Sequence, residues 1–175
     1  MRFLFTVAVL VAGAATADDK KGTPVELAGM KSTTPADWKQ ETPKEKMRLT
    51  QFVLPKAEDD KDDAVLALFV FPGGSGSVKD NLARQLAKFV EDGRKEKVDK
   101  TKVGPIEATY QDVTGTYKKK AFPMAEKFEP IKDYRQLYVV FEDKDGKQYY
   151  MTLVGPQKTI EKHKKGFEEW LKNFK

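Results

Sequence analysis

The chain has 175 residues, of which 34% are charged, and its formal net charge is +5. This small excess of basic residues is well below that of a dedicated nucleic-acid-binding domain, and the aromatic content of 11% is too high for a disordered chain. Because no cysteine is present, disulfide bonds, a thiolate nucleophile and a thiolate metal site are all excluded.

The first residues have the pattern of a secretory signal peptide. Arg2 precedes an apolar run over residues 3–11, and Ala15-Thr16-Ala17 matches the small residues of a cleavage site. The run is shorter than the roughly 20 residues of a membrane span, and no later stretch is apolar enough to cross a bilayer. We therefore expect export to the periplasm or the medium, with a retained N-terminal anchor as the alternative. The expected organisation is a signal peptide over 1–17, a flexible lead over 18–24 and one domain over 25–175.

The first half of the domain predicts strands. Residues 25–34 indicate one weak strand that Pro35 ends, and Trp38 follows between two prolines. An indole in this setting usually packs at the edge of a core, while a ligand platform or partner surface is the alternative. Residues 47–55 alternate in polarity, and residues 64–71 are continuously apolar, as in a central strand covered on both faces. The charged loop 56–63 joins them into a hairpin and lacks the D-x-D-x-D-G spacing of a calcium loop, so no metal site is expected.

The stretch FPGGSGSVKDN, residues 71–81, contains a glycine-rich loop before an expected helix. It has neither the Gly-Lys-Ser/Thr of a P-loop nor the third glycine of a dinucleotide-binding loop. Ser77 and Asp80 instead form the S-x-x-D pattern of a capping box, and the helix is expected to end at Gly93. Because helix N-termini attract anions, the alternative is an anion site in the 73–77 segment. Its candidate residues are Gly74, Ser75, Gly76, Ser77 and Lys79.

The second half of the domain predicts more strands and a final helix. Residues 94–105 read as a charged connection, residues 106–118 as a strand with an irregularity at Gly115, and residues 118–133 as a long loop. Two β-rich runs, 134–143 and 148–155, flank an Asp-Gly turn, which is typical of a hairpin. The last stretch places Ile160, Phe167, Trp170, Leu171 and Phe174 on one stripe of a helix that begins with a proline.

These elements predict a single α+β domain with a largely antiparallel sheet flanked by helices. Lys118, Lys119 and Lys120 form a basic entrance to the expected loop after residue 118, and with Trp38 they are candidates for a partner surface. His163, the single histidine, lies beside the apolar stripe, where a structural hydrogen bond is more common than catalysis. No serine lies in a G-x-S-x-G turn. We therefore assign no catalytic residue and no cofactor.

Several short motifs occur in an order that resembles a known family. They are Trp38 after TPAD, Met47-Arg48, Gly73-Gly74-Ser75, NLARQLAKF at 81–89, GTY at 115–117, YRQL at 134–137 and GP at 155–156. The pattern is similar to that of secreted bacterial proteins of unknown function with a Mog1/PsbP-like sandwich. Gln85 and Lys88 stand where the family helix, N-x-x-R-W-x-x-Q-F, has Trp and Gln. The resemblance implies an antiparallel sheet flanked by helices, an accessory or partner-binding role and no catalytic residues.

Three functions are compatible with the sequence. The first is an exported, soluble, non-catalytic accessory or binding protein whose partner is a protein or an envelope polymer, with no specific nucleic acid. The second is an anion or polyanion binder that uses the 73–77 segment and the lysine clusters. The third is a hydrolase whose carboxylates are dispersed along the chain. The sequence leaves the ligand and the oligomeric state open.

Overall fold

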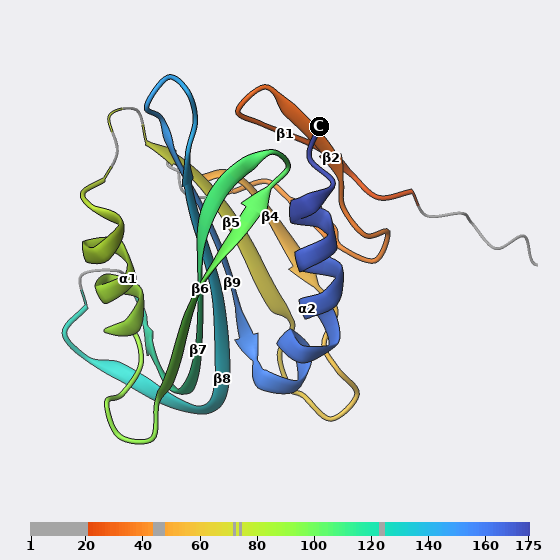
Figure 1. Ribbon diagram of the computed structural model, residues 1–175. Coiled ribbons are helices and arrows are strands. Elements are labelled where there is room, and N and C mark those ends of the chain that lie inside the picture. Colours follow the sequence, from red (N-terminus) through yellow and green to blue (C-terminus); the bar gives the residue numbers. More distant parts are fainter. Residues whose placement is uncertain (1–20, 44–47, 72, 74, 123–124) are drawn as a thin grey trace, which may run out of the picture.

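The computed structural model describes residues 21–43, 48–71, 73, 75–122 and 125–175. In these residues one seven-stranded sheet lies between two helices, and a small hairpin packs beside the second helix (Figure 1). The predicted α+β class and the largely antiparallel sheet are therefore confirmed. The expected signal peptide over 1–17 and the first part of the expected lead lie outside the described residues.

Every neighbouring pair of strands in the large sheet is antiparallel. The spatial order is β3 (Lys39–Glu41), β4 (Arg48–Leu54), β5 (Ala64–Phe71), β9 (Gln148–Pro156), β8 (Phe128–Glu142), β7 (Ile106–Lys120) and β6 (Lys95–Val103). The helices are α1 (Val78–Leu86) and α2 (Gln157–Lys172), and the separate hairpin consists of β1 (Pro24–Leu27) and β2 (Met30–Thr33). The helices cover opposite faces of the sheet (Figure 1). In the described ranges, neither helix has the length and apolar character needed to cross a bilayer.

The main core lies between the sheet and α2. Side chains alternate between the two faces of a strand, so Leu66, Leu153 and Leu137 from three adjacent strands all point to this side. The helix contributes Ile160, Phe167, Trp170 and Leu171. Such continuous burial of aliphatic and aromatic side chains is the main source of the stability of a domain of this size.

Trp38 belongs to this core rather than to the surface. It is 3% exposed, and its ring meets that of Trp170 edge to face at 5.6 Å between centroids. The β1–β2 hairpin closes the same end, because Ser32 donates from Oγ to the Trp170 carbonyl at 3.1 Å and Lys31 exchanges backbone hydrogen bonds with Lys175. The packing of Trp38 at the edge of the core is the structure that its sequence context most favoured.

The opposite face of the sheet is covered by α1 and has a smaller core. Tyr138, Val140 and Tyr150 are buried there, with Phe69, Phe71 and Leu82 partly buried against them. Asn81 is the buried residue of α1, all of whose residues are described, whereas α2 buries six residues. This face is therefore packed less completely than the α2 face.

The structure confirms the hairpins that the sequence predicts. Strands β4 and β5 pair across the charged loop, and β8 and β9 pair across the Asp-Gly turn, where Gly146 has a φ of 75°. Strand β5 is central and covered on both faces, as its continuous apolar run indicates. The register of β7 against β8 shifts between Gly115 and Tyr117, which is the irregularity expected there.

Four expectations were wrong. Residues 95–103, expected to be part of a charged connection, form the edge strand β6. Their side chains are exposed and mostly charged, as in a loop, but their backbone pairs with β7. Residues 118–133 are not one long loop, since β7 continues to Lys120 and β8 begins at Phe128.

Residues 25–34 form two strands joined by a tight turn, and Thr23 already bonds Thr34, so the domain begins inside the expected lead. Helix α1 ends at Leu86, seven residues before Gly93.

Candidate functional site

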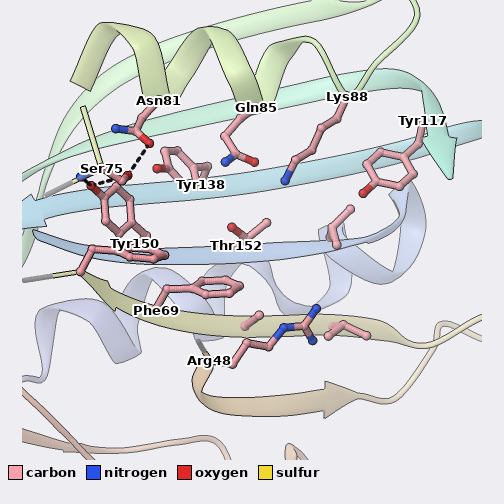
Figure 2. Close-up of a pocket in the computed structure, with 14 residues that line it drawn as sticks. Arg48, Phe69, Ser75, Asn81, Gln85, Lys88, Tyr117, Tyr138, Tyr150 and Thr152 are labelled. Carbon is pink, nitrogen blue, oxygen red and sulfur yellow. Dashed lines mark hydrogen bonds between the residues drawn. The ribbon is translucent and has the colours of Figure 1, made fainter. Parts of the chain in front are cut away.

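A cavity of about 290 Å³ lies between α1 and the sheet. Figure 2 shows Asn81, Gln85 and Lys88 above it, and Tyr138, Tyr150, Thr152 and Phe69 on the strands below. We call this cavity the α1 cleft. Its volume is at the lower limit of pockets that bind small molecules.

Simple periodicity directs the side chains into the cleft. Asn81, Gln85 and Lys88 are four and three residues apart, so they lie on one side of α1 and of the turn that continues it. On β5 and β9, Phe69 and Tyr150 belong to the set of alternate residues that faces away from α2. The cleft is therefore a direct consequence of the helix and strand periods.

Two polar atoms in the wall of the cleft have no hydrogen-bond partner among the described residues. They are the hydroxyl of Tyr138, a residue that is 1% exposed, and the Oε1 of Gln85. Burial also raises the pKa of Tyr138 above its usual value, so the phenol stays protonated at neutral pH. An unpaired buried polar atom costs about 1–3 kcal/mol, and a ligand or a water molecule that bonds these two atoms in the cavity would remove that cost.

Two cations face the same space. Arg48 on β4 lies with its guanidinium 5.8 Å from the centroid of the Phe69 ring and donates to the Gln51 side chain. The ammonium of Lys88 has no hydrogen bond or ion pair in the described part of the chain. Burial, and to a smaller extent Arg48, lower the pKa of Lys88 to about 8. Positive charge is thus concentrated at one end of the α1 cleft.

A second cavity, of about 530 Å³, continues from this end and shares Arg48, Lys88 and Tyr117 with the α1 cleft. Its further lining includes Arg84, Lys118, Lys120 and Phe122, and we call it the basic pocket. Within the described residues, no carboxylate lines either cavity. The combined surface therefore favours negatively charged ligands.

The glycine-rich segment lies at the other end of the cleft. The backbone N–H of Ser75 donates to the Tyr150 hydroxyl at 3.1 Å, and its own hydroxyl lies 2.9 Å from the same oxygen. Ser77 accepts from the Asp80 N–H at 3.1 Å, so the predicted helix cap is confirmed. These groups therefore already have partners within the protein, and the Asp80 carboxylate lies close to the same helix start.

The other candidates for an anion site at this helix start are Gly74, Gly76 and Lys79. Gly76 and Lys79 are exposed and do not line the cleft, and Gly74 lies outside the described residues. The anion site at the 73–77 segment stays a prediction.

The candidates for a partner surface fall into two groups. Trp38 is buried in the main core and does not belong to the molecular surface. Lys119 and Lys120 are exposed, whereas Lys118 is half-buried with its ammonium 3.2 Å from the Ala87 carbonyl. Lys118 and Lys120 line the basic pocket, so part of this predicted surface adjoins the cleft.

His163 has a structural environment. Its Nε2 lies 2.8 Å from the Pro55 carbonyl, and the side chain is 5% exposed beside Trp38. In the described ranges, no three His, Asp or Glu side chains lie together in a way that could hold a metal ion.

Sequence reasoning missed Arg48, Gln85, Lys88 and Tyr138 as site residues. Tyr138 reads as one aromatic of a strand, and Arg48 as the start of another, so neither stands out without the tertiary structure. The sequence did contain a signal for Gln85 and Lys88. Gln85 and Lys88 are the positions at which the chain departs from the helix pattern of the family that it resembles.

The architecture and the position of the helices define a PsbP-like α+β domain. Among solved structures, the chain is similar to cyanobacterial PsbP (CyanoP) from Synechocystis sp. PCC 6803, with 12% sequence identity and a TM-score of 0.51. The match covers 94% of this chain and 98% of that chain. No protein-family model and no curated protein sequence matches the chain. At this identity the comparison establishes the fold alone.

Proposed function

We propose that this protein is an exported, soluble, non-catalytic accessory protein that acts by binding a ligand in the α1 cleft. The signal-peptide pattern of residues 1–17 supports export. The PsbP-like fold supports an accessory role by analogy with the proteins that the sequence resembles. The cleft supplies the place of binding.

One observation carries the binding function. The Tyr138 hydroxyl and Gln85 Oε1 are buried without partners in the wall of one cavity, although most buried polar groups in proteins are hydrogen-bonded. A ligand that supplies an acceptor to Tyr138 and a donor to Gln85 would remove both costs. Such a ligand gains affinity for the same reason.

The test is a fragment titration of the purified protein, followed by two-dimensional amide NMR. We expect chemical-shift changes that concentrate on the lining of the α1 cleft, and their loss in Tyr138→Phe for fragments that bind the phenol. Tyr110→Phe is a matched control, because Tyr110 lies on the α2 face and bonds Glu168 instead. Shift changes that are absent, or that are confined to residues outside the cleft, would overturn the proposal.

Binding of a polyanion is the second candidate function. It is favoured by the cluster of Arg84, Lys118 and Lys120 around the basic pocket, with exposed Lys119 beside it. Retention on heparin that persists at ~150 mM salt supports it, because phosphate and sulfate contacts weaken steeply with salt. Elution at low salt contradicts it. The hydrolase alternative finds no support at this cleft, since no carboxylate of the described residues lines it.

A further inference from the structure

We propose that the ligand of the α1 cleft is a small aromatic oxyanion, with its acid group between Arg48 and Lys88 and a hydroxyl at the opposite end of its ring. This inference rests on the proposed binding function and specifies its ligand. Three parts of the cleft carry it, namely a cationic end, an aromatic middle and a neutral polar end.

The cationic end requires an anion. Arg48 and Lys88 reach the cavity from different sides, one from the sheet and one from the turn after α1 (Figure 2). Two like charges at one partly desolvated place repel each other, and an oxyanion between them replaces this repulsion with two charge-assisted hydrogen bonds. No carboxylate of the described ranges lines the cavity.

The middle of the cleft is apolar and aromatic. Phe71 meets Tyr150 edge to face at 5.5 Å between centroids, and the Phe69 and Phe71 rings are parallel at 6.4 Å. The small side chain of Ala67 leaves room between the larger ones. A dry cavity of about 150 Å³ accommodates benzene. A volume of about 290 Å³ therefore suits one ring with a short acidic arm.

The neutral polar end specifies a hydroxyl. Tyr138 offers a buried O–H that needs an acceptor, and Gln85 offers an Oε1 that needs a donor. A ligand hydroxyl can accept from Tyr138. Gln85 lies between Tyr138 and Lys88 (Figure 2), so its Oε1 is available to a donor nearer the middle of the cleft. The hydroxyl is uncharged, which suits this end of the cleft because the cations lie at the other end (Figure 2).

The test uses isothermal titration of the purified protein with three related probes. They are para-hydroxyphenylacetate, phenylacetate, which lacks the hydroxyl, and tyrosol, which lacks the acid. We expect para-hydroxyphenylacetate to bind about tenfold or more tightly than either of the others, as expected for loss of one buried hydrogen bond or one ionic contact. If tyrosol bound as tightly as para-hydroxyphenylacetate, the proposed contact of the acid with the cationic end would be wrong. If phenylacetate bound as tightly as para-hydroxyphenylacetate, the proposed contact of the hydroxyl with the polar end would be wrong.

Inorganic phosphate distinguishes an aromatic ligand from a plain anion. We expect phosphate to bind at least about tenfold more weakly than para-hydroxyphenylacetate, since it leaves the aromatic middle empty. Phosphate that binds as tightly as the aromatic acid and displaces it would overturn the proposal in favour of a simple anion site. A fragment that binds the cleft while all three aromatic probes fail would overturn the ligand class but leave the binding function intact.

Substitutions of cleft residues test whether para-hydroxyphenylacetate binds in the α1 cleft. Lys88→Met and Tyr138→Phe should each weaken binding of para-hydroxyphenylacetate by about tenfold or more. Lys79→Met is the matched control, because Lys79 is an exposed lysine of α1 that does not line the cleft. Should Lys88→Met fail to fold, Lys88→Gln removes the same charge with a polar side chain. Unchanged affinity in a folded variant at position 88 would contradict the proposed position of the acid.

Discussion

Lys88 and Arg48 place two positive charges at the same cavity, and this proximity adds to burial in lowering the pKa of Lys88 to about 8 from 10.5. The unfolded chain holds its proton on this lysine more tightly than the folded protein does. Below pH 8 the charge is therefore a full cost to folding, and the cost disappears as pH rises from about 8 towards the ordinary value.

Removal of this charge should stabilise the protein. We expect Lys88→Met to raise the free energy of unfolding at pH 7 by on the order of 1–3 kcal/mol, since each unit of pKa shift corresponds to about 1.4 kcal/mol. The gain should shrink at pH 10, where the wild-type lysine is neutral in the folded state. Urea unfolding at both pH values measures it, and a loss of stability at both would contradict the strain at this position.

Ligand affinity should depend on pH in the same range. An acid bound beside Lys88 needs the ammonium form, so affinity for para-hydroxyphenylacetate should be constant between about pH 6 and 7, where its carboxyl is ionised, and fall as pH rises through about 8. Lys88→Met should abolish this dependence, and titration calorimetry across the range measures it. Among the described residues, the other charged or titratable groups that line the two cavities with Lys88 are Arg48, Arg84, Tyr117, Lys118, Lys120, Tyr138 and Tyr150. A Lys118→Met variant that removed the dependence instead would assign the titration to the basic pocket.

The cap of α1 at Ser77 can be tested by its effect on the stability of the fold. Ser77→Ala removes the acceptor of the Asp80 N–H, and we expect a loss of about 1 kcal/mol. Millimolar phosphate should leave the melting temperature of both proteins unchanged, because the Ser75 N–H and the Ser75 and Ser77 hydroxyls already have partners within the protein. Thermal melts with and without phosphate measure this, and stabilisation by phosphate that Ser77→Ala or Lys79→Ala abolishes would make the 73–77 segment an anion site.

Substitution of Gly76 tests whether the backbone of this loop requires a glycine. Its φ of 100° is unfavourable for any residue with a side chain, although a Cβ would have space, with the nearest atom, of Arg84, at 3.6 Å. Gly76→Val should therefore destabilise the fold by about 1–3 kcal/mol through backbone strain. Gly166→Ala is a suitable comparison, since this helical glycine has an ordinary φ and alanine should stabilise α2 by up to about 1 kcal/mol. Equal stability of Gly76→Val and the wild type in urea unfolding would contradict the strained turn.

Export can be tested directly. When the full chain is produced in a host with a general secretory pathway, we expect the periplasmic or extracellular fraction to contain a protein that begins at Asp18. N-terminal mass spectrometry of the fractions measures this. Recovery of the chain with residues 1–17 in the membrane fraction would support the retained anchor instead.

Strong local signals made most of the fold predictable. The Asp-Gly turn between two β-rich runs, the central strand 64–71 and the apolar stripe of α2 all depend on contacts that a short window of sequence reveals. Strand β6 was missed for the opposite reason. Its side chains face water at the edge of the sheet, so they carry charge instead of an apolar period, and its pairing with β7 decides its conformation.

The candidate site was less predictable because it joins distant segments. Arg48, Lys88 and Tyr138 become neighbours of one cavity only when β4, β8 and the end of α1 meet, and each residue has an ordinary local context. An unpaired hydroxyl is a property of the folded environment, which no spacing in the sequence encodes. The departure at Gln85 and Lys88 from the resembled pattern indicated the right helix, without revealing what its side chains face.

The unequal burial of the two helices separates folding from recognition. Six buried residues fix α2 to the core, whereas α1 buries Asn81 and packs on the sheet through partly buried residues such as Leu82. Opening of α1 alone should therefore require much less free energy than global unfolding, and ligand exchange can occur while the main core stays intact. The same division favours evolutionary change, because substitutions under α1 can alter the choice of ligand without disturbing the residues on which folding depends.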